Sequence, residues 1–179
     1  MKVFLHVCCG PCTIYPLTVL REKGIEVTGH FFNPNIHPYK EFQRRLSSLQ
    51  DYAVDAKLPL ILDPGYGLFD FVRRVAFNEA ERCNICYHMR LEKTVLLARE
   101  LGFNAFSTTL LYSRYQRHLH LISLCEKLAT QYNIPFYYQD FREGWQYGID
   151  ASKKLEMYRQ PYCGCIYSEQ ERYDKSFRK

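Results

Sequence analysis

A short apolar run leads directly into a cluster of three cysteines at the start of the chain. Residues 1–7 read Met-Lys-Val-Phe-Leu-His-Val, and Cys8-Cys9-Gly10-Pro11-Cys12 follows. The run predicts a buried strand, and residues 13–20 predict the start of a helix. Thiols at such a turn lie at the carboxyl edge of a sheet, where open α/β folds bind ligands. The helix N-terminus favours thiolate over thiol, so we expect this turn to form half of a metal site.

Strand and helix patterns alternate along the rest of the chain. The predicted strands cover 3–7, 25–32, 59–62, 104–111 and 134–141. The predicted helices cover 13–24, 40–57, 68–101 and 114–132, and the chain from about 144 is again helical except around 161–166. Since 68–101 is too long for one uncapped globular helix, we expect it to break near Cys83-Asn84-Ile85-Cys86.

Five rounds of strand and helix predict an α/β fold with a parallel sheet covered by helices on both faces. We expect a single domain over 1–179, a three-layer α/β/α architecture with a five-stranded parallel sheet and additional C-terminal helices. This Rossmann-like plan resembles that of the HUP/PP-loop nucleotide-binding proteins, whose Ser-Gly-Gly-x-Asp-Ser loop follows the first strand. The cysteine cluster stands in that place, and no Walker or dinucleotide motif occurs, which argues against ATP-dependent chemistry.

Composition sets the class of protein and its compartment. The chain is 47% hydrophobic and 24% charged, as in ordinary globular proteins, and no stretch approaches the ~20 apolar residues of a membrane span. The first residues lack the pattern of a signal peptide, so we expect a cytoplasmic protein. A net charge of +5 and plentiful aromatic residues permit a nucleic-acid partner without requiring one.

Two pairs of cysteines together supply four thiolates. Cys83 and Cys86 are three residues apart, so in a helical turn both thiols point the same way. With Cys8 and Cys9 they make the complement for a [4Fe–4S] cluster or a tetrahedral zinc ion. Adjacent cysteines should point in different directions and chelate one small ion awkwardly. This argument favours an iron–sulfur cluster over zinc, and chance spacing is the remaining alternative.

A third group, Cys163-Gly164-Cys165, suits redox chemistry. One glycine between the cysteines lets the two sulfurs meet, but the small ring departs from relaxed disulfide geometry. Strained, exposed disulfides are easily reduced, which suits an electron relay. The alternative is that both residues are further metal ligands.

Four other residues could be structural or functional. Cys125 lies on an apolar helical stripe and is expected in the core. His6 is expected to be a hydrogen-bonded core histidine. Cys12 is either a ligand of a second site or a packed side chain. Asp140, at the end of the last predicted strand, either ligates a metal or donates a proton, or else caps the next helix.

Several stretches together resemble one family, the cobalamin-independent epoxyqueuosine reductases of the QueH type. They are His6-Val7-Cys8-Cys9-Gly10-Pro11-Cys12, Phe32-Asn33-Pro34-Asn35-Ile36 with Pro38, Cys83-Asn84-Ile85-Cys86-Tyr87 with Arg90, and Tyr158-Arg159-Gln160-Pro161-Tyr162-Cys163-Gly164-Cys165. Phe106-Ser107-Thr108-Thr109-Leu110 and Asp140-Phe141-Arg142 add support, and the match spans essentially the whole chain. Gly10 stands where many members have Ala, which puts little in doubt.

The resemblance implies reductive removal of the epoxide oxygen of epoxyqueuosine at the tRNA wobble position, which gives queuosine. It implies a [4Fe–4S] cluster held by Cys8, Cys9, Cys83 and Cys86. It also implies a redox-active pair, Cys163 and Cys165, and an additional iron for which Cys12 and Asp140 are candidate ligands. The partners would be tRNA and an electron donor that the sequence does not identify.

Two other functional classes stay open on the sequence: a zinc-stabilised RNA-binding module without redox activity, and a plain thiol–disulfide oxidoreductase. Basic residues that are candidates to contact tRNA are Arg44, Arg45, Arg114, Arg117, Lys153, Lys154, Arg172, Lys175, Arg178 and Lys179.

Overall fold

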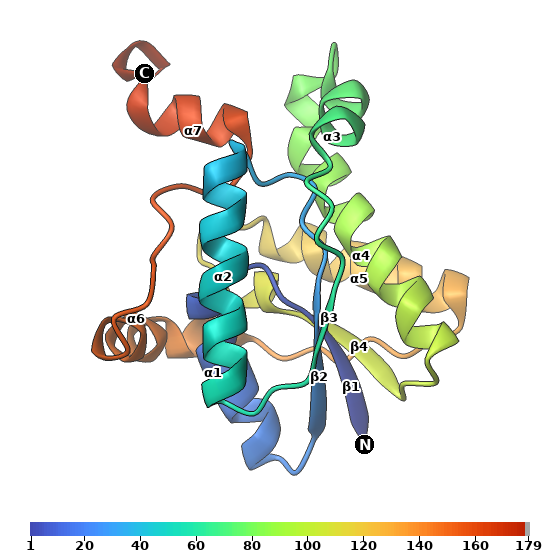
Figure 1. Cartoon of the computed structure of the whole chain (residues 1–179). Helices are drawn as coiled ribbons and strands as arrows, with labels where there is room; N and C mark the ends of the chain where they lie inside the picture. Colours follow the sequence, from blue (N-terminus) through green and yellow to red (C-terminus); the bar gives the residue numbers. More distant parts are fainter. Residues whose placement is uncertain (178–179) are drawn as a thin grey trace.

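The computed structural model describes residues 1–177, and its centre is a parallel sheet in the order β3-β2-β1-β4 (Figure 1). The strands are β1 (Lys2–His6), β2 (Glu26–Phe31), β3 (Leu60–Leu62) and β4 (Ala105–Thr108). β1 is flanked on one side by β2, with Val3 opposite Val27, and on the other by β4, with Val3 opposite Ala105. The predicted α/β class and parallel sheet are confirmed.

Helices cover both faces of this sheet (Figure 1). They are α1 (Gly10–Glu22), α2 (Tyr39–Asp55), α3 (Leu68–Val75), α4 (Arg82–Glu100), α5 (His118–Tyr132), α6 (Trp145–Lys154) and α7 (Ile166–Tyr173). α1 packs against α2 and α6 on one side, and α4 packs against α5 on the other. Within residues 1–177 no helix is both long and apolar enough to cross a membrane.

The predicted fifth strand over 134–141 is wrong. The segment makes a single parallel bridge, between Phe106 and Phe136, so the sheet has four strands. Pro135 has no N–H to donate, and its carbonyl accepts from Phe106 N at 3.0 Å. Asp140 then caps the 3₁₀ helix η3 (Phe141–Gly144), which ends the extended stretch. Pairing is therefore limited to the bridge beside β4.

The break in the long helical stretch lies before the cysteine pair, not at it. α3 ends at Val75, and Phe77 takes a left-handed conformation with φ 62° that an α-helix cannot continue through. A 3₁₀ turn, η1 (Glu79–Glu81), then leads into α4. Cys83 and Cys86 therefore both lie in the first turns of one continuous helix.

The strand order places the site residues at a switch point of the sheet. β2 and β3 lie on one side of β1, and β4 lies on the other, so the chain reverses its direction of winding between β1 and β4. Ligands of open α/β sheets bind outside the carboxyl ends of the strands at such a switch point. α1 follows β1 there, and the 3₁₀ helix η2 (Thr109–Tyr112) follows β4.

The sheet and its helices are joined by a core that includes Leu49, a fully buried residue of α2. Leu49→Ala should lower the free energy of unfolding by about 2–5 kcal/mol, because it removes buried methyl groups and leaves a cavity. Urea denaturation followed by circular dichroism measures this. On the same helix Val54 is 78% exposed, and Val54→Ala should change stability by less than about 0.5 kcal/mol. Equal losses in the two variants would contradict this account of the core.

Candidate active site

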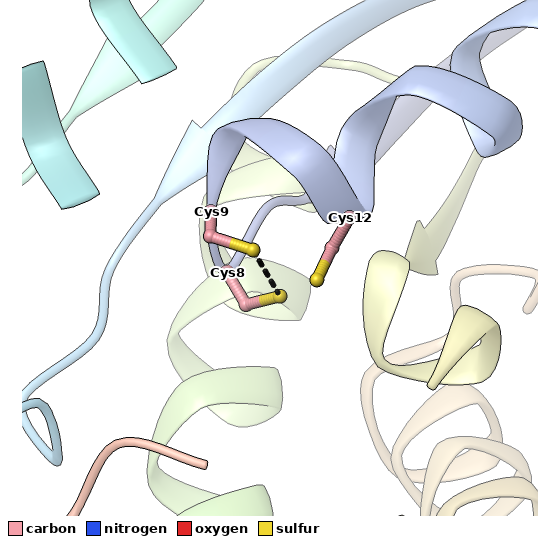
Figure 2. A group of neighbouring side chains, drawn as sticks. All are labelled: Cys8, Cys9 and Cys12. Atoms are coloured by element: carbon pink, nitrogen blue, oxygen red, sulfur yellow. Dashed lines mark hydrogen bonds between the residues drawn. The ribbon is translucent and has the colours of Figure 1, made fainter. Parts of the chain in front are cut away.

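The three cysteines after β1 gather around one point (Figure 2). Cys9 is the N-cap of α1 with extended backbone, φ −170° and ψ 164°, and its side chain makes no cap hydrogen bond. Its thiol is therefore available, and the sulfurs of Cys8, Cys9 and Cys12 lie within 4.8 Å of one another. Gly10 allows the turn to pack closely, because a Cβ there would lie 2.5 Å from Met157 Cε.

The expectation that Cys8 and Cys9 point apart is wrong. Their sulfurs are 3.7 Å apart. Two sulfurs bound to one tetrahedral ion at about 2.3 Å would be roughly 3.8 Å apart. With the extended backbone of Cys9, the two side chains point toward each other, so this adjacent pair could bind one ion. The geometric argument against a single zinc ion is therefore wrong.

Side chains from distant parts of the chain donate to these sulfurs. Gln160 Nε2 lies 3.1 Å from Cys9 Sγ and 3.4 Å from Cys12 Sγ, and Thr109 Oγ1 donates to Cys8 Sγ at 3.3 Å. Hydrogen bonds from Cys12 and Cys9 hold the pKa of Cys8 well below its usual value, with further help from Arg90 and Thr109. Hydrogen bonds to Cys8 raise the pKa of Cys12 in turn, while burial raises that of Cys9.

A cysteine whose pKa is lowered, Cys8, together with two neighbouring thiols and several N–H and O–H donors, is an arrangement that fits a metal site. All three cysteines are free. Negative sulfur ligands with outer donors to them are what iron–sulfur clusters and zinc both require.

A second group of thiols comes from α4 and from the segment before α7. It consists of Cys83, Cys86, Cys163 and Cys165, all free. Burial raises the pKa of Cys86 to about 12 and also raises that of Cys83. Cys163 is exposed, and partial desolvation raises the pKa of its thiol. Cys86 and Cys165 pack together with Phe71 of α3.

Arg90, which is only 3% exposed, lies between the two thiol groups. Its Nη1 donates to Cys86 Sγ at 3.6 Å, and its Nε donates at 3.3 Å to Nε2 of His6, two residues before Cys8. Burial acts to lower the pKa of Arg90, but its electrostatic interactions with Cys86 and Cys8 and its hydrogen bond to Cys86 outweigh burial and raise the pKa. The two groups therefore face a common charge at the carboxyl edge of the sheet. They do not form one tight set, since among the described residues only Cys8, Cys9 and Cys12 lie within 4.8 Å of one another.

His6 fixes the orientation of Arg90 from the sheet side. An arginine always donates, so His6 Nε2 accepts and Nδ1 carries the proton, which it donates to Thr108 Oγ1 at 2.9 Å. Burial, followed by the charge of Arg90, lowers the pKa of His6 and keeps the ring neutral. The prediction of a hydrogen-bonded core histidine is confirmed. The ring also accepts a hydrogen bond from the Arg90 guanidinium, which lies beside the thiols.

A clamp from α2 holds the Cys163-Gly164-Cys165 segment. Arg45 is 3% exposed and pairs with Glu41 at 2.7 Å. Its two Nη atoms donate to the carbonyls of Cys163 and Tyr162 at 2.8 and 3.0 Å. Gly164 has φ 154°, and a Cβ there would lie 3.2 Å from Arg45 Nη1, so the glycine allows this close approach. Cys163 is thus held through its backbone carbonyl, whereas the Cys165 thiol accepts from Ser168 N at 3.4 Å as the cap of α7.

Asp140 caps η3 and is paired with a neighbouring arginine. Its Oδ1 accepts from the backbone N of Arg142 at 3.0 Å, and its Oδ2 accepts from Arg142 Nη2 at 2.6 Å. The hydrogen bond from the Arg142 side chain is the main cause that lowers the pKa of Asp140 to about 2. His118 Nε2 lies 4.0 Å away. At neutral pH the carboxyl is therefore ionised and has no proton to donate.

Some residues of the site were not predicted from the sequence, or were predicted to have another role. Gln116 Nε2 donates to Cys163 Sγ at 3.4 Å, and no motif marked this residue. Arg45, a candidate for tRNA contact, is buried in the clamp instead. Gln160 and Arg90 did lie in the motifs that carried the resemblance, which was the one signal that could have singled them out. Cys125 is fully buried, as predicted.

The other basic candidates that the structure describes lie on the surface. Arg44, Arg114, Arg117, Lys153, Lys154 and Lys175 are exposed. The guanidinium of Arg44 lies 5.8 Å from the ring centroid of Tyr158. Arg178 and Lys179 are outside the described residues.

A parallel α/β sheet whose switch point carries thiols in two groups, with a buried guanidinium between them, defines a class of protein: one that uses thiolates to hold a metal or to carry electrons. A family model, Epoxyqueuosine reductase QueH, matches residues 3–171. The chain belongs to this family.

Individual relatives agree along most of the chain. The epoxyqueuosine reductase QueH of Dehalococcoides mccartyi is 37% identical over 174 residues, which cover 97% of this chain and 96% of that protein. The QueH of Acinetobacter baylyi is 35% identical over 176 residues, covering 93% and 80%. Among solved structures, the U34-tRNA thiolase NcsA from Methanococcus maripaludis with its [4Fe-4S] cluster aligns over 93% of this chain and 76% of that one. Its TM-score of 0.32 at 12% identity gives no basis for an argument about fold or site.

Arg90 should control how readily Cys8 ionises. In metal-free protein, Arg90→Gln should raise the pKa of Cys8, because a stabilising positive charge is lost. Below the pKa, each unit of increase lowers the thiolate fraction about tenfold. Cys8 should then react more slowly with iodoacetamide, as measured by mass spectrometry with fragment localisation. Arg90→Lys should be intermediate, and Arg99→Gln at the far end of α4 is the control. An unchanged rate in Arg90→Gln would contradict this role.

Proposed function

We propose that this chain is an epoxyqueuosine reductase, which removes the epoxide oxygen of epoxyqueuosine at the wobble position of tRNA to give queuosine. The observation that carries the proposal is the pairing of two thiol groups with one buried guanidinium at the sheet's switch point, in a chain of the QueH family. We also propose that the sheet is Rossmann-like and of the HUP/PP-loop kind, since β3-β2-β1-β4 is the order of the first four strands in that fold.

The reaction defines what the residues must supply. Both C–O bonds of the epoxide break, an alkene forms, and the oxygen leaves as water, which takes two electrons and two protons. Oxidation of two thiols to one disulfide releases two electrons and two protons, so the Cys163–Cys165 dithiol balances one turnover. An external electron donor then has to reduce the disulfide again.

Cys8, Cys9, Cys83 and Cys86 would hold the [4Fe–4S] cluster. The donor set fits such a group, since thiolates are its ligands, and Gln160, Thr109 and Arg90 already direct N–H and O–H groups at these sulfurs. When bound, a cluster supplies single-electron transfer, and an exposed iron can act as a Lewis acid on the departing oxygen. An additional iron is part of the proposal, with Cys12 and Asp140 as its candidate ligands.

The protein's own residues would contribute binding and charge. Arg90 would balance the negative charge of the sulfur ligands. Arg45 and Glu41 would hold Cys163 in register while its thiol is oxidised and reduced. Gln116 would donate a hydrogen bond to the Cys163 thiolate. The ionised Asp140 can hold a cation but cannot serve as the general acid, so the protons would come from the dithiol.

Anaerobically purified protein should be brown and contain roughly four irons per chain from the cluster. It should convert epoxyqueuosine in tRNA to queuosine with a chemical reductant, as measured by mass spectrometry of the nucleosides. Cys83→Ser should lose most of the iron and all activity. Cys163→Ser should keep the iron and lose turnover supported by thiol reductants. Cys125→Ala, a change at a fully buried cysteine outside both groups, should keep both.

Other results would favour the alternatives. Colourless protein with one zinc per chain and no turnover would indicate a zinc-stabilised RNA-binding module. Full activity in Cys83→Ser together with none in Cys163→Ser would indicate a plain thiol–disulfide oxidoreductase.

A further inference from the structure

One continuous segment touches both thiol groups. At its start Thr109 Oγ1 donates to Cys8 Sγ at 3.3 Å, and near its end Gln116 Nε2 donates to Cys163 Sγ at 3.4 Å. The next residue, Arg117, donates its backbone N–H to Tyr87 of α4. Segment 109–117 therefore runs along the edge of the site, and its exposed residues mark the side from which a large substrate can approach.

The exposed part of this segment builds an aromatic platform with Trp145. The Arg114 guanidinium carbon lies 5.8 Å from the centroid of the Trp145 ring, and the Tyr115 ring meets that ring edge-on at 5.6 Å. Tyr115 is 83% exposed. Beneath them the buried Tyr112 ring packs on Trp145 at 5.2 Å, and its hydroxyl donates to the Trp145 carbonyl at 3.0 Å. Trp145 is thus held by Tyr112, and Tyr115 is the exposed ring of the platform.

This platform lies beside the thiols and carries unpaired positive charge. Tyr112 belongs to η2, which packs against α1, the helix that begins at the cysteine turn. Gln160, the residue after Arg159, donates to Cys9 Sγ at 3.1 Å. Arg114, Arg117 and Arg159 are exposed. None of the three has a carboxylate partner in the described part of the chain.

We propose that the basic aromatic surface, formed by Arg114, Tyr115, Arg117, Trp145 and Arg159, binds the single-stranded anticodon loop of tRNA. The guanidiniums contact phosphates, and the Tyr115–Trp145 platform stacks on a base next to the one that enters the site. This inference rests on the proposed function. An exposed tyrosine ring and a partly exposed tryptophan ring, set among guanidiniums without carboxylate partners, suit RNA loops, because every unstacked base has a π-face and every linkage carries a negative charge.

The test is binding of a fluorescein-labelled anticodon stem-loop RNA to the full chain, measured by anisotropy over a range of salt concentrations. Arg114→Gln, Arg117→Gln and Arg159→Gln should each weaken binding several-fold and reduce the slope of log K against log salt by about 0.7 to 1. Tyr115→Ala should weaken binding roughly tenfold and leave the slope unchanged, because stacking releases no counterions. Melting temperatures within a few degrees of the wild type would show that these exposed changes leave the fold intact.

The matched control is Arg99→Gln. Arg99 is an exposed residue at the C-terminal end of α4, and its guanidinium lies 5.9 Å from the ring centroid of Tyr132. It therefore makes the same kind of cation–π pair as Arg114 and Trp145, but at the end of α4 away from the cysteines. This variant should bind RNA as the wild type does. An equal loss of affinity in Arg99→Gln would mean that binding is diffuse electrostatic attraction, and the proposed surface would be wrong.

Turnover of epoxyqueuosine-containing tRNA by the wild type separates the two proposals. If the wild type converts this tRNA but the surface variants bind RNA with unchanged affinity and slope, the surface is wrong and the proposed function stands. If the same variants bind RNA normally but accept electrons more slowly from a protein thiol donor, the surface belongs to the donor and the inference is overturned. If the wild type neither binds nor converts the tRNA, the proposed function itself fails.

Discussion

The buried charge of Arg90 is the constraint on which the site depends. Thiolates are stable inside a protein only where positive charge and hydrogen-bond donors replace the water that they lose. Arg90 supplies both, since it donates to Cys86 and stands within electrostatic reach of Cys8. A buried guanidinium also needs partners for its N–H groups, and the Cys86 sulfur and His6 Nε2 accept from it, while Cys8, whose pKa is lowered, lies within electrostatic reach. His6, at the end of the central strand, accepts from Arg90 and ties this balance to the sheet.

The sheet positions the first thiol group, and α2 positions the segment that contains Cys163. The switch between β1 and β4 brings the turn before α1 next to Thr109, which places the first thiol group at the switch point. Of the cysteines near the C-terminus, Cys165 caps α7, whereas Cys163 lies in the preceding loop. Arg45 holds this loop through backbone carbonyls, and Glu41 neutralises its buried charge. A dithiol held in this way could change its redox state without losing its anchor.

The proposed chemistry and the proposed RNA surface would meet along segment 109–117. The segment donates to a sulfur of each thiol group, while its exposed residues face outward with Trp145. The modified base would then leave the anticodon loop and pass segment 109–117 to reach the thiols, while a neighbouring base stayed stacked on the Tyr115–Trp145 platform. The substrate would be held by its loop, so that the site itself need accommodate only the modified base.

Local patterns in the sequence were enough to predict a parallel α/β sheet and the positions of its thiols in turns and first helical turns. They also carried the family, because four separate motifs had to occur in one order. The same patterns could not limit residues 134–141 to a bridge, since the lost pairing depends on Pro135 facing β4. Nor could they show that Cys8 and Cys9 turn their sulfurs together, that Arg45 is buried, or that Gln116 meets Cys163. Periodicity and turn residues report burial and backbone conformation close in sequence, whereas the direction of each side chain and its contacts with other elements are decided only when the whole fold has packed.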